Sequence, residues 1–327
     1  MRPALEVNGL TRSFGKFTAI RDIEFRVMPG QICGFIGPNG AGKTTTMRIC
    51  ATLDLPDDGE VSVGGRSVLE DPAGVRARLG FMPDSFGTYV NTTVLDHLDF
   101  FARAYGLRGA ERRRSLARLI EFTNLEGLLN KETRALSKGM KQRLCLAKTL
   151  LHDPEVLILD EPAAGLDPRA RIELRELVRA LAGMGKAVLI SSHILSELSE
   201  LCDSVVVIES GRIRATGNVQ EVVRNLRRAA SGAGEKGPED PTEEVLRVFL
   251  RTMAPAEALE RTLLEFPGIA QATVERLGVA CEIKGGEASL ARIVAALSQA
   301  GTPPVEVVLE GMDLEDVFLH LTEGRVQ

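Results

Sequence analysis

The most constraining feature of this sequence is a glycine-rich segment at residues 37–44, Gly-Pro-Asn-Gly-Ala-Gly-Lys-Thr. It fits the pattern G-x-x-x-x-G-K-[ST], in which a loop binds phosphate groups through backbone N–H donors. The apolar residues 31–36 before it predict a short strand, and residues 45–50 after it predict the start of a helix. The alternative is an ordinary glycine-rich turn before a buried helix. A strand, such a loop and a helix in this order favour an α/β fold with a phosphate site at the end of a strand.

The residue types of the loop predict distinct roles in binding a nucleotide. Glycines let the backbone turn its N–H groups toward an anion, and the helix N-terminus adds partial positive charge. We expect Lys43 to reach the β- and γ-phosphates and the Thr44 hydroxyl to bind Mg2+, which prefers oxygen ligands. The expected nucleotide-binding positions of this segment are Gly37, Pro38, Asn39, Gly40, Ala41, Gly42, Lys43, Thr44 and Thr45.

Composition limits the classes of partner. A chain of 327 residues with 44% hydrophobic residues can build two domains with real cores. The net charge of -5 gives no electrostatic footprint for nucleic acid, so no direct nucleic-acid binding is expected. Residues 1–6 lack the apolar region of a signal peptide, and no run approaches the about 18 apolar residues of a membrane span. Any membrane role is therefore expected to come through a partner. The five cysteines form no C-x-x-C pair, which predicts small core residues in a reducing compartment.

A second apolar strand, predicted at residues 156–159, ends in Asp160 and Glu161. A fully apolar strand is typical of a buried parallel sheet, which carries its chemistry at the C-terminal edge. We expect Asp160 to hold Mg2+ and Glu161 to accept a proton from an attacking water as general base. The alternative is that one carboxylate only caps the turn at Pro162. A further predicted strand at residues 187–190 leads to His193, which is a candidate contact for the γ-phosphate rather than an ordinary hydrogen-bonding residue.

Several other residues stand at positions with two interpretations. Phe14, in a predicted turn region before the loop, either stacks on an adenine ring or belongs to the core. Ser137 is the predicted N-cap of a helix, and the free N–H groups there either bond to Ser137 itself or bind a phosphate. Asp167 is the predicted N-cap of the next helix. Thr93 and Asp96 resemble a capping box that opens a helical region at about residues 90–152. This region predicts an inserted helical subdomain.

The composition changes abruptly at residues 227–244, where glycine, serine, proline and charged residues predict a flexible linker. The expected domains are therefore residues 1–226, with the helical insertion, and residues 245–327. The second predicts the order β-α-β-β-α-β of a small ferredoxin-like α+β module, followed by a helix at residues 313–322. It carries no recognisable catalytic constellation, so we expect a role in interaction or regulation.

Together these motifs resemble the nucleotide-binding subunits of ATP-binding cassette (ABC) transporters, over about two-thirds of the chain. The resemblance implies a P-loop NTPase fold, ATP as nucleotide, Mg2+ as metal and hydrolysis coupled to transport. It identifies residues 37–45 as the Walker A loop, Asp160 and Glu161 as Walker B, and Phe14 as the adenine-stacking aromatic. The remaining assignments are Asp167 in the D-loop, His193 as the switch histidine, and Leu136, Ser137, Lys138, Gly139 and Met140 as the signature.

The resemblance also implies an assembly. In this family two cassettes pack head to tail, so each ATP lies between one chain's Walker A loop and the other chain's signature. The prediction is a homodimer that drives separately encoded transmembrane permeases, docked near residues 84–101, at the cytoplasmic face of the cell membrane. The C-terminal module looks like that of bacterial drug and antibiotic exporter ATPases. The alternatives are a soluble ABC ATPase that acts on ribosomes or DNA, and a regulatory protein that senses nucleotide without hydrolysing it.

The sequence departs from the family pattern in two places. The signature reads Leu-Ser-Lys-Gly-Met where Leu-Ser-Gly-Gly-Gln is common, so Lys138 either places a cation near the partner's phosphates or is an exposed side chain. Asp84 occupies the Q-loop position, where the family has glutamine. An aspartate can hold a water bound to Mg2+, but it is shorter, charged and donates no hydrogen bond. We therefore expect Mg2+ dependence and coupling to the permease to differ from those of a relative with glutamine.

Overall fold

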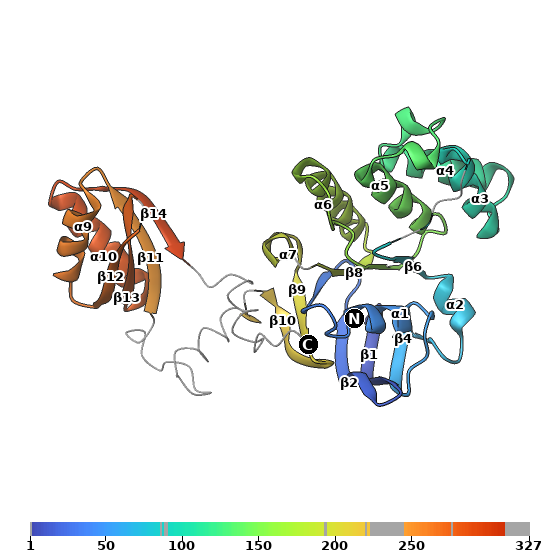
Figure 1. Cartoon of the computed structure of the whole chain (residues 1–327), viewed down its shortest axis with the longest axis horizontal. Coiled ribbons are helices and arrows are strands. Elements are labelled where there is room, and N and C mark those ends of the chain that lie inside the picture. The colour runs from blue at the N-terminus through green and yellow to red at the C-terminus, as the bar shows by residue number, and fades with distance from the viewer. Residues whose placement is uncertain are drawn as a thin grey trace. The chain divides into compact units, whose positions relative to one another are not determined.

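The computed structural model describes residues 2–85, 87, 91–192, 195–219, 221–222, 245–275 and 277–310. The described residues form two compact units, one reaching Val222 and one within residues 245–310 (Figure 1). The predicted linker at residues 227–244 and the predicted helix at 313–322 lie outside the described residues, and the domain boundaries stay a prediction. No helix in the described part of the chain has the length and apolar character needed to cross a bilayer.

The first unit is built on a six-stranded sheet of order β10-β9-β3-β8-β7-β6. Five strands run parallel, and β10 is antiparallel to β9. The strands β3, β7 and β8 are buried at every residue, as expected for parallel strands covered on both faces. Their bounds are β3 Ile32–Ile36, β6 Leu79–Met82, β7 Val156–Leu159, β8 Ala187–Ser191, β9 Ser204–Glu209 and β10 Arg212–Asn218.

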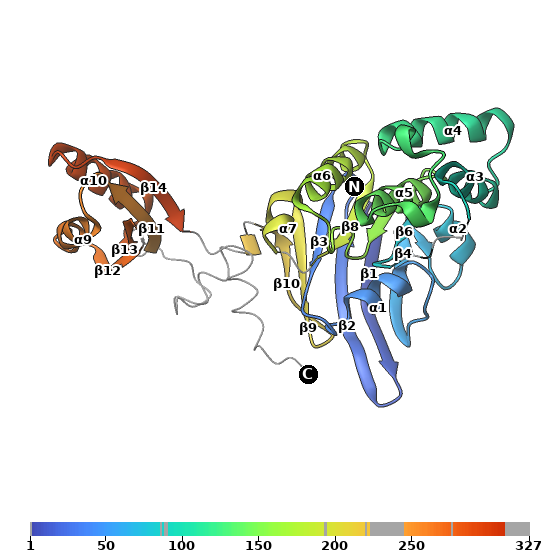
Figure 2. The ribbon, with the colours of Figure 1, turned by 45° about the horizontal axis from the view of Figure 1, so that its top comes forward.

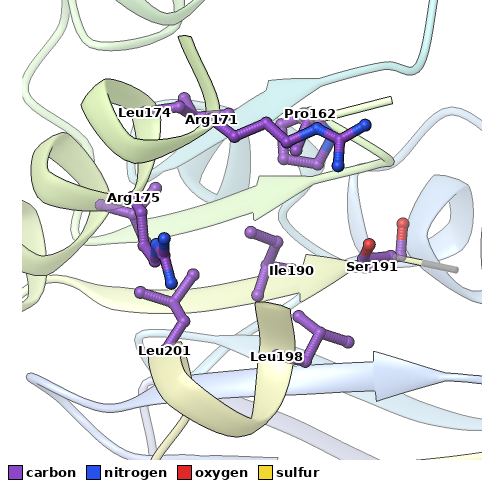
Figure 3. A pocket seen from close by; sticks show the side chains of 11 residues that line it. Pro162, Arg171, Leu174, Arg175, Ile190, Ser191, Leu198 and Leu201 are labelled. Atoms are coloured by element: carbon purple, nitrogen blue, oxygen red, sulfur yellow. The ribbon is translucent and has the colours of Figure 1, made fainter. Parts of the chain in front are cut away.

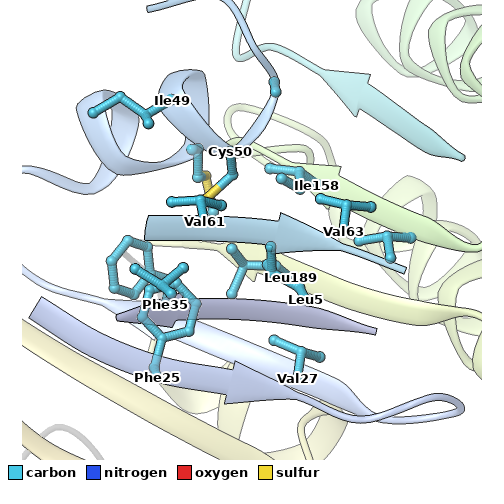
Figure 4. Close-up of a cluster of buried hydrophobic side chains, with 14 of the residues drawn as sticks. Leu5, Phe25, Val27, Phe35, Ile49, Cys50, Val61, Val63, Ile158 and Leu189 are labelled. Atoms are coloured by element: carbon cyan, nitrogen blue, oxygen red, sulfur yellow. The ribbon is translucent and has the colours of Figure 1, made fainter. Parts of the chain in front are cut away.

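A second, antiparallel sheet of order β2-β1-β4-β5 belongs to the same unit. Its strands are β1 Leu5–Phe14, β2 Phe17–Val27, β4 Asp58–Val63 and β5 Arg66–Ser67. The pairing of β1 with β2 continues through polar residues near their turn, such as Ser13 and Thr18. Figure 4 shows the core that joins the two sheets and helix α1 (Lys43–Cys50), with Phe25 and Phe35 5.4 Å apart between ring centroids. This core fixes the start of α1 relative to both sheets.

The helices of the first unit include the predicted helical insertion. In both views α3 (Val94–Ala104), α4 (Gly109–Phe122) and α5 (Lys138–Thr149) lie together, while α6 covers the sheet beside them (Figure 2). The capping box of Thr93 and Asp96 is confirmed at the start of α3. The other helical elements are α2 Pro72–Arg76, the 3-10 turns Glu126–Leu128 and Thr133–Ala135, α6 Pro168–Gly183 and α7 Leu195–Leu201.

The second unit has the predicted order β-α-β-β-α-β. Its antiparallel sheet has the order β12-β13-β11-β14, and apolar residues of β11, β13, α9 and α10 form its core. The elements are β11 Val245–Thr252, α9 Ala256–Leu264, β12 Ile269–Glu275, β13 Gly278–Lys284, α10 Gly286–Gln299 and β14 Pro304–Glu310. Cysteines of both units are free thiols, and four of the five are buried, as predicted.

Candidate nucleotide site

The C-terminal ends of β3, β6 and β7 meet at one edge of the six-stranded sheet, where they border a cleft of about 340 Å3. The cleft brings together residues that are far apart in the sequence. The side chains and backbone that line it belong to Phe14, Phe17, Ala19, Pro38, Asn39, Gly40, Gly42, Lys43, Thr44, Thr45, Asp84 and Glu161. Gly37 and Ala41 complete the loop beneath this surface, and Asp160 lies buried beside Thr44.

The glycines of the loop satisfy two separate requirements. A Cβ added at Gly37 would lie 2.3 Å from the carbonyl oxygen of Ile208, so this position has no room for a side chain. Gly42 has a φ of 108°, and a Cβ there would lie 2.5 Å from Cγ2 of Ile20. Gly40 has open space around it but a φ of 80°, which side-chain-bearing residues rarely adopt. The close approach of strands β2 and β9 thus holds the loop at the start of α1.

Lys43 is buried and folds over the loop. Its Nζ donates hydrogen bonds to the carbonyl oxygens of Gly37 at 2.6 Å and Pro38 at 3.2 Å. Burial lowers the pKa of Lys43 from its usual value, while the carboxylates of Glu161 and Asp160 act to raise it. The ammonium group is therefore placed among loop carbonyls and acidic side chains at the edge of the cleft.

A hydrogen-bonded chain connects the ends of α1, β7 and β8. The Thr44 hydroxyl donates to Oδ2 of Asp160 at 2.9 Å, and the Ser191 hydroxyl donates to Oδ1 at 2.7 Å. The Ser191 oxygen also accepts a bond of 2.8 Å from the backbone N–H of Glu161. The Thr44 hydroxyl and the Asp160 carboxylate are paired hard oxygen donors, a set that fits Mg2+.

Two aromatic residues stand at the rim of the cleft. Phe14 ends β1 and Phe17 begins β2, and their side chains are 48% and 56% exposed. Phe14 therefore does not belong to the core, which was one of its two interpretations. The guanidinium of Arg12 lies 4.8 Å from the centroid of the Phe14 ring and is itself paired with Asp54 and Asp57. An exposed ring held in this way offers a face for stacking.

Asp84 follows β6 and lines the cleft. It is exposed, and its Oδ1 accepts a hydrogen bond of 2.6 Å from the backbone N–H of Ser85. The structure thus brings the Q-loop position to the same cleft as Lys43 and Glu161. His193, the predicted switch histidine, lies outside the described residues.

The signature residues do not line this cleft. Ser137 is the N-cap of α5, as predicted, and its Oγ accepts a bond of 3.3 Å from the N–H of Met140. Leu136 is buried, and Lys138 is exposed with its Nζ 2.5 Å from where a Cβ on Gly165 would lie. Gly139 packs against α6, since an added Cβ would lie 3.2 Å from Cβ of Ala170.

The D-loop aspartate begins the neighbouring helix. Asp167 is the N-cap of α6, as predicted, and its Oδ1 accepts a bond of 3.0 Å from the N–H of Ala170. Asp167 is not among the residues that line the cleft. The signature and the D-loop therefore lie side by side at the starts of α5 and α6, apart from the phosphate loop of the same chain.

Sequence reasoning missed three residues of the site. Phe17 and Ala19 line the cleft because the turn after β1 is tight, and the pair Phe14 and Phe17 on either side of that turn was the available signal. Ser191 bonds to both Walker B residues because β7 and β8 are parallel neighbours. The sequence alone does not reveal the partners of a hydroxyl at the end of an apolar strand, because they depend on which strand lies beside it.

Comparisons with known proteins agree with this geometry. A sequence model of the family described as ABC transporter matches residues 20–164. The Nod factor export ATP-binding protein I of Ralstonia nicotianae is 34% identical, covering 99% of this chain and 94% of the relative. The daunorubicin resistance ATP-binding protein DrrA3 of Streptomyces coeruleorubidus is 35% identical, covering 98% and 96%.

Solved structures resemble the first unit. The ATP-binding subunit of an ABC transporter is 33% identical with a TM-score of 0.63, covering 72% of this chain and 95% of that one. A bacterial ABC transporter cassette whose dimeric structure is known is 23% identical with a TM-score of 0.60, covering 65% and 98%. The likeness to this cassette, at 23% identity, supports the fold alone.

Proposed function

Because the chain belongs to the ATP-binding proteins of ABC transporters, a family of ATPases, we propose that it hydrolyses ATP to power an exporter. The observation that carries the proposal is the cleft, in which Lys43, Thr44 and Glu161 converge from distant segments. The direction of transport is inferred from relatives that match almost the full length and are named for Nod factor export and daunorubicin resistance. The match extends through the second unit, so it is not limited to the cassette.

We assign the nucleotide as follows. Phosphates lie on the loop of residues 37–45, where backbone N–H groups and the N-terminus of α1 supply positive potential. Lys43 contacts the terminal phosphates, and the adenine stacks on the exposed ring of Phe14. Mg2+, held by Thr44 and Asp160 with Asp84 as a further oxygen donor, would neutralise phosphate charge when bound.

Hydrolysis then depends on residues at the ends of β7 and β8. We infer that Glu161 accepts a proton from the water that attacks the γ-phosphate and that His193 orients the γ-phosphate. Glu161 and Lys43 line the same cleft, which supports roles for both at the phosphate end of the nucleotide.

We further propose that the site is completed by a second copy of the chain. Ser137 and Gly139 begin α5 outside the cleft, and Ser137 is exposed, so this signature is free to face another chain's phosphate loop. ATP binding would close a homodimer and hydrolysis would reopen it. Separate transmembrane permeases would receive this motion at the cytoplasmic face of the membrane, near α3, where Leu95 and Phe100 are exposed.

The first test is the substitution Glu161→Gln. The amide cannot act as a base, and general-base assistance is worth roughly two to four decades in rate, so phosphate release should fall by that factor. Binding of ATP should remain as in the wild type, because the phosphate loop is unchanged. Lys43→Ala should instead weaken nucleotide binding itself. Turnover like that of the wild type in Glu161→Gln would contradict the assigned role.

A further inference from the structure

Ser191 bonds to both members of the Walker B pair. It is the last residue of β8 and is fully buried. A serine hydroxyl has one proton to donate and lone pairs to accept. Here the proton goes to Oδ1 of Asp160 at 2.7 Å, while the oxygen accepts from the N–H of Glu161 at 2.8 Å.

The backbone at Glu161 explains why this bond matters. Glu161 has a φ of 48°, in the left-handed region that residues other than glycine seldom adopt. Such a conformation persists only where the surroundings hold it. The bond from its N–H to Ser191 is one such restraint, and it sets the direction in which the Glu161 side chain leaves the strand.

The same hydroxyl fixes the Asp160 carboxylate. Thr44 bonds to Oδ2 and Ser191 bonds to Oδ1, so each oxygen of the Asp160 carboxylate accepts a hydrogen bond from one hydroxyl group. Ser191 does not line the nucleotide cleft. It lines a separate cavity of about 30 Å3 between α6, α7 and β8, which Figure 3 shows with Ile190, Leu174 and Leu198 around it.

We propose that Ser191 is a positioning residue for ATP hydrolysis, which acts by orienting the Asp160 carboxylate and the Glu161 backbone through one hydroxyl group. It contacts the reacting groups only through these two residues. The inference rests on the proposed roles of Asp160 and Glu161. The rate of ATP turnover should therefore depend on the hydroxyl at position 191. The affinity for nucleotide should not depend on it.

The sharpest test compares Ser191→Thr with Ser191→Val. The two introduced side chains have nearly the same shape and differ in whether they carry a hydroxyl. Both fill part of the adjacent cavity, which is large enough for a water molecule that could replace the lost hydroxyl in Ser191→Ala. The comparison therefore isolates the two hydrogen bonds from changes of volume.

In the full-length chain, Ser191→Val should lower kcat at saturating ATP and Mg2+ by about 10- to 100-fold, as losses of such supporting bonds do. Ser191→Thr should retain most of the wild-type kcat. Affinity for ATP measured without Mg2+ should be the same in all three proteins. Equal turnover of the two variants would overturn the proposal, as would a loss of ATP affinity that matches the loss of turnover.

Two controls make the result decisive. Thr123→Val removes another fully buried hydroxyl, which bonds to the Leu119 carbonyl at 2.6 Å far from the site, and it should leave kcat unchanged. If neither position-191 variant folds, Ser191→Cys decides, because its thiol fills the place of the hydroxyl but is only a weak donor and acceptor. Wild-type kcat in Ser191→Cys would refute the proposal, and a selective loss of kcat would support it. If Glu161→Gln is inactive while Ser191→Val is normal, only this inference fails. If Glu161→Gln is active, the function assigned to the site fails first.

Discussion

Gly42, in the phosphate loop, combines a positive φ with close neighbours. A methyl group there would meet Ile20 Cγ2 at 2.5 Å and the Ala19 carbonyl oxygen at 2.9 Å, on a backbone with a φ of 108°. We expect Gly42→Ala to cost about 1–3 kcal/mol of unfolding free energy and to weaken ATP binding, because the loop must shift to relieve the contact. Chemical denaturation and nucleotide titration measure the two effects.

The matched control is Gly183→Ala. Gly183 ends α6 with nothing within 4 Å of an added Cβ, and its φ lies outside the positive range. Alanine there should leave stability equal or slightly higher, since it lowers the entropy of the unfolded chain. A Gly42→Ala protein as stable as Gly183→Ala, with normal ATP affinity, would show that the loop adapts freely.

Asp84 gives a second prediction at the scale of single residues. Asp84 and Thr44 line the same cleft, so replacing Asp84 with the neutral amide of glutamine removes negative charge from the site of the proposed metal. We expect Asp84→Gln to raise the Mg2+ concentration for half-maximal ATPase activity by about tenfold. A Mg2+ titration at fixed ATP measures this. A curve that superimposes on the wild type would assign Asp84 no role in metal binding.

The sequence allowed most of the residues that line the cleft to be predicted, because they belong to contiguous motifs. Lys43 and Thr44 lie within one loop, and Glu161 directly follows an apolar strand. Ser191 could not be predicted in the same way. Its role depends on which strand lies beside β7, and that order is set by packing of the whole sheet rather than by residues near position 191.

Among the secondary-structure elements, helix α3 should make stability depend on pH. His97 is 1% exposed on this helix, and burial, with Lys148 nearby, lowers its pKa from 6.5 to about 4. Between these values the unfolded chain binds a proton that the folded chain does not, so stability is present above pH 6.5 and is lost as pH falls toward 4.

We therefore expect the thermal midpoint of the wild type to fall more steeply between pH 6.5 and 4 than that of His97→Gln. Glutamine does not titrate, so the difference between the two slopes reports His97 alone. Differential scanning calorimetry at several pH values measures it. Parallel curves would mean that His97 titrates equally in the folded and unfolded chain.

Element types were predicted better than element limits. Apolar periodicity identified α5 and the central strands, and the helix caps at Thr93, Ser137 and Asp167 were correct because each is a local side-chain-to-backbone bond. The hairpin of β1 and β2 continues through polar residues up to its turn between Phe14 and Phe17. Cross-strand pairing with a partner, here Ser13 with Thr18, holds polar residues in the sheet, and local composition does not reveal it.

For the whole molecule, the exposed signature predicts association that depends on nucleotide. Glu161→Gln protein with ATP should run as a dimer in light scattering, because ATP would bridge two chains and is not consumed. The same protein without ATP, and a Lys43→Ala, Glu161→Gln double variant with ATP, should remain monomeric. Persistent monomer in all three would contradict a site shared between two chains.

The proposed homodimer also explains why the phosphate loop and the signature lie apart within one chain. The phosphate loop and the signature both stand at helix starts, α1 and α5, and only the first borders the cleft. Both are proposed to bind phosphate, as helix N-termini can. Sequence motifs predicted both the phosphate loop and the signature. Their separation became visible only when the fold placed each at the end of a different helix.

The bonds of Lys43 bear on how tightly the cleft can hold its ligand. Each hydrogen bond that the ammonium group gives to the Gly37 and Pro38 carbonyls is one that a phosphate oxygen must compete for. The affinity for nucleotide then depends on the difference between the bonds of Lys43 to phosphate and its bonds to the loop carbonyls. The loop carbonyls thus compete with the nucleotide for Lys43. A site of this kind can release its product readily, which an ATPase that turns over repeatedly requires.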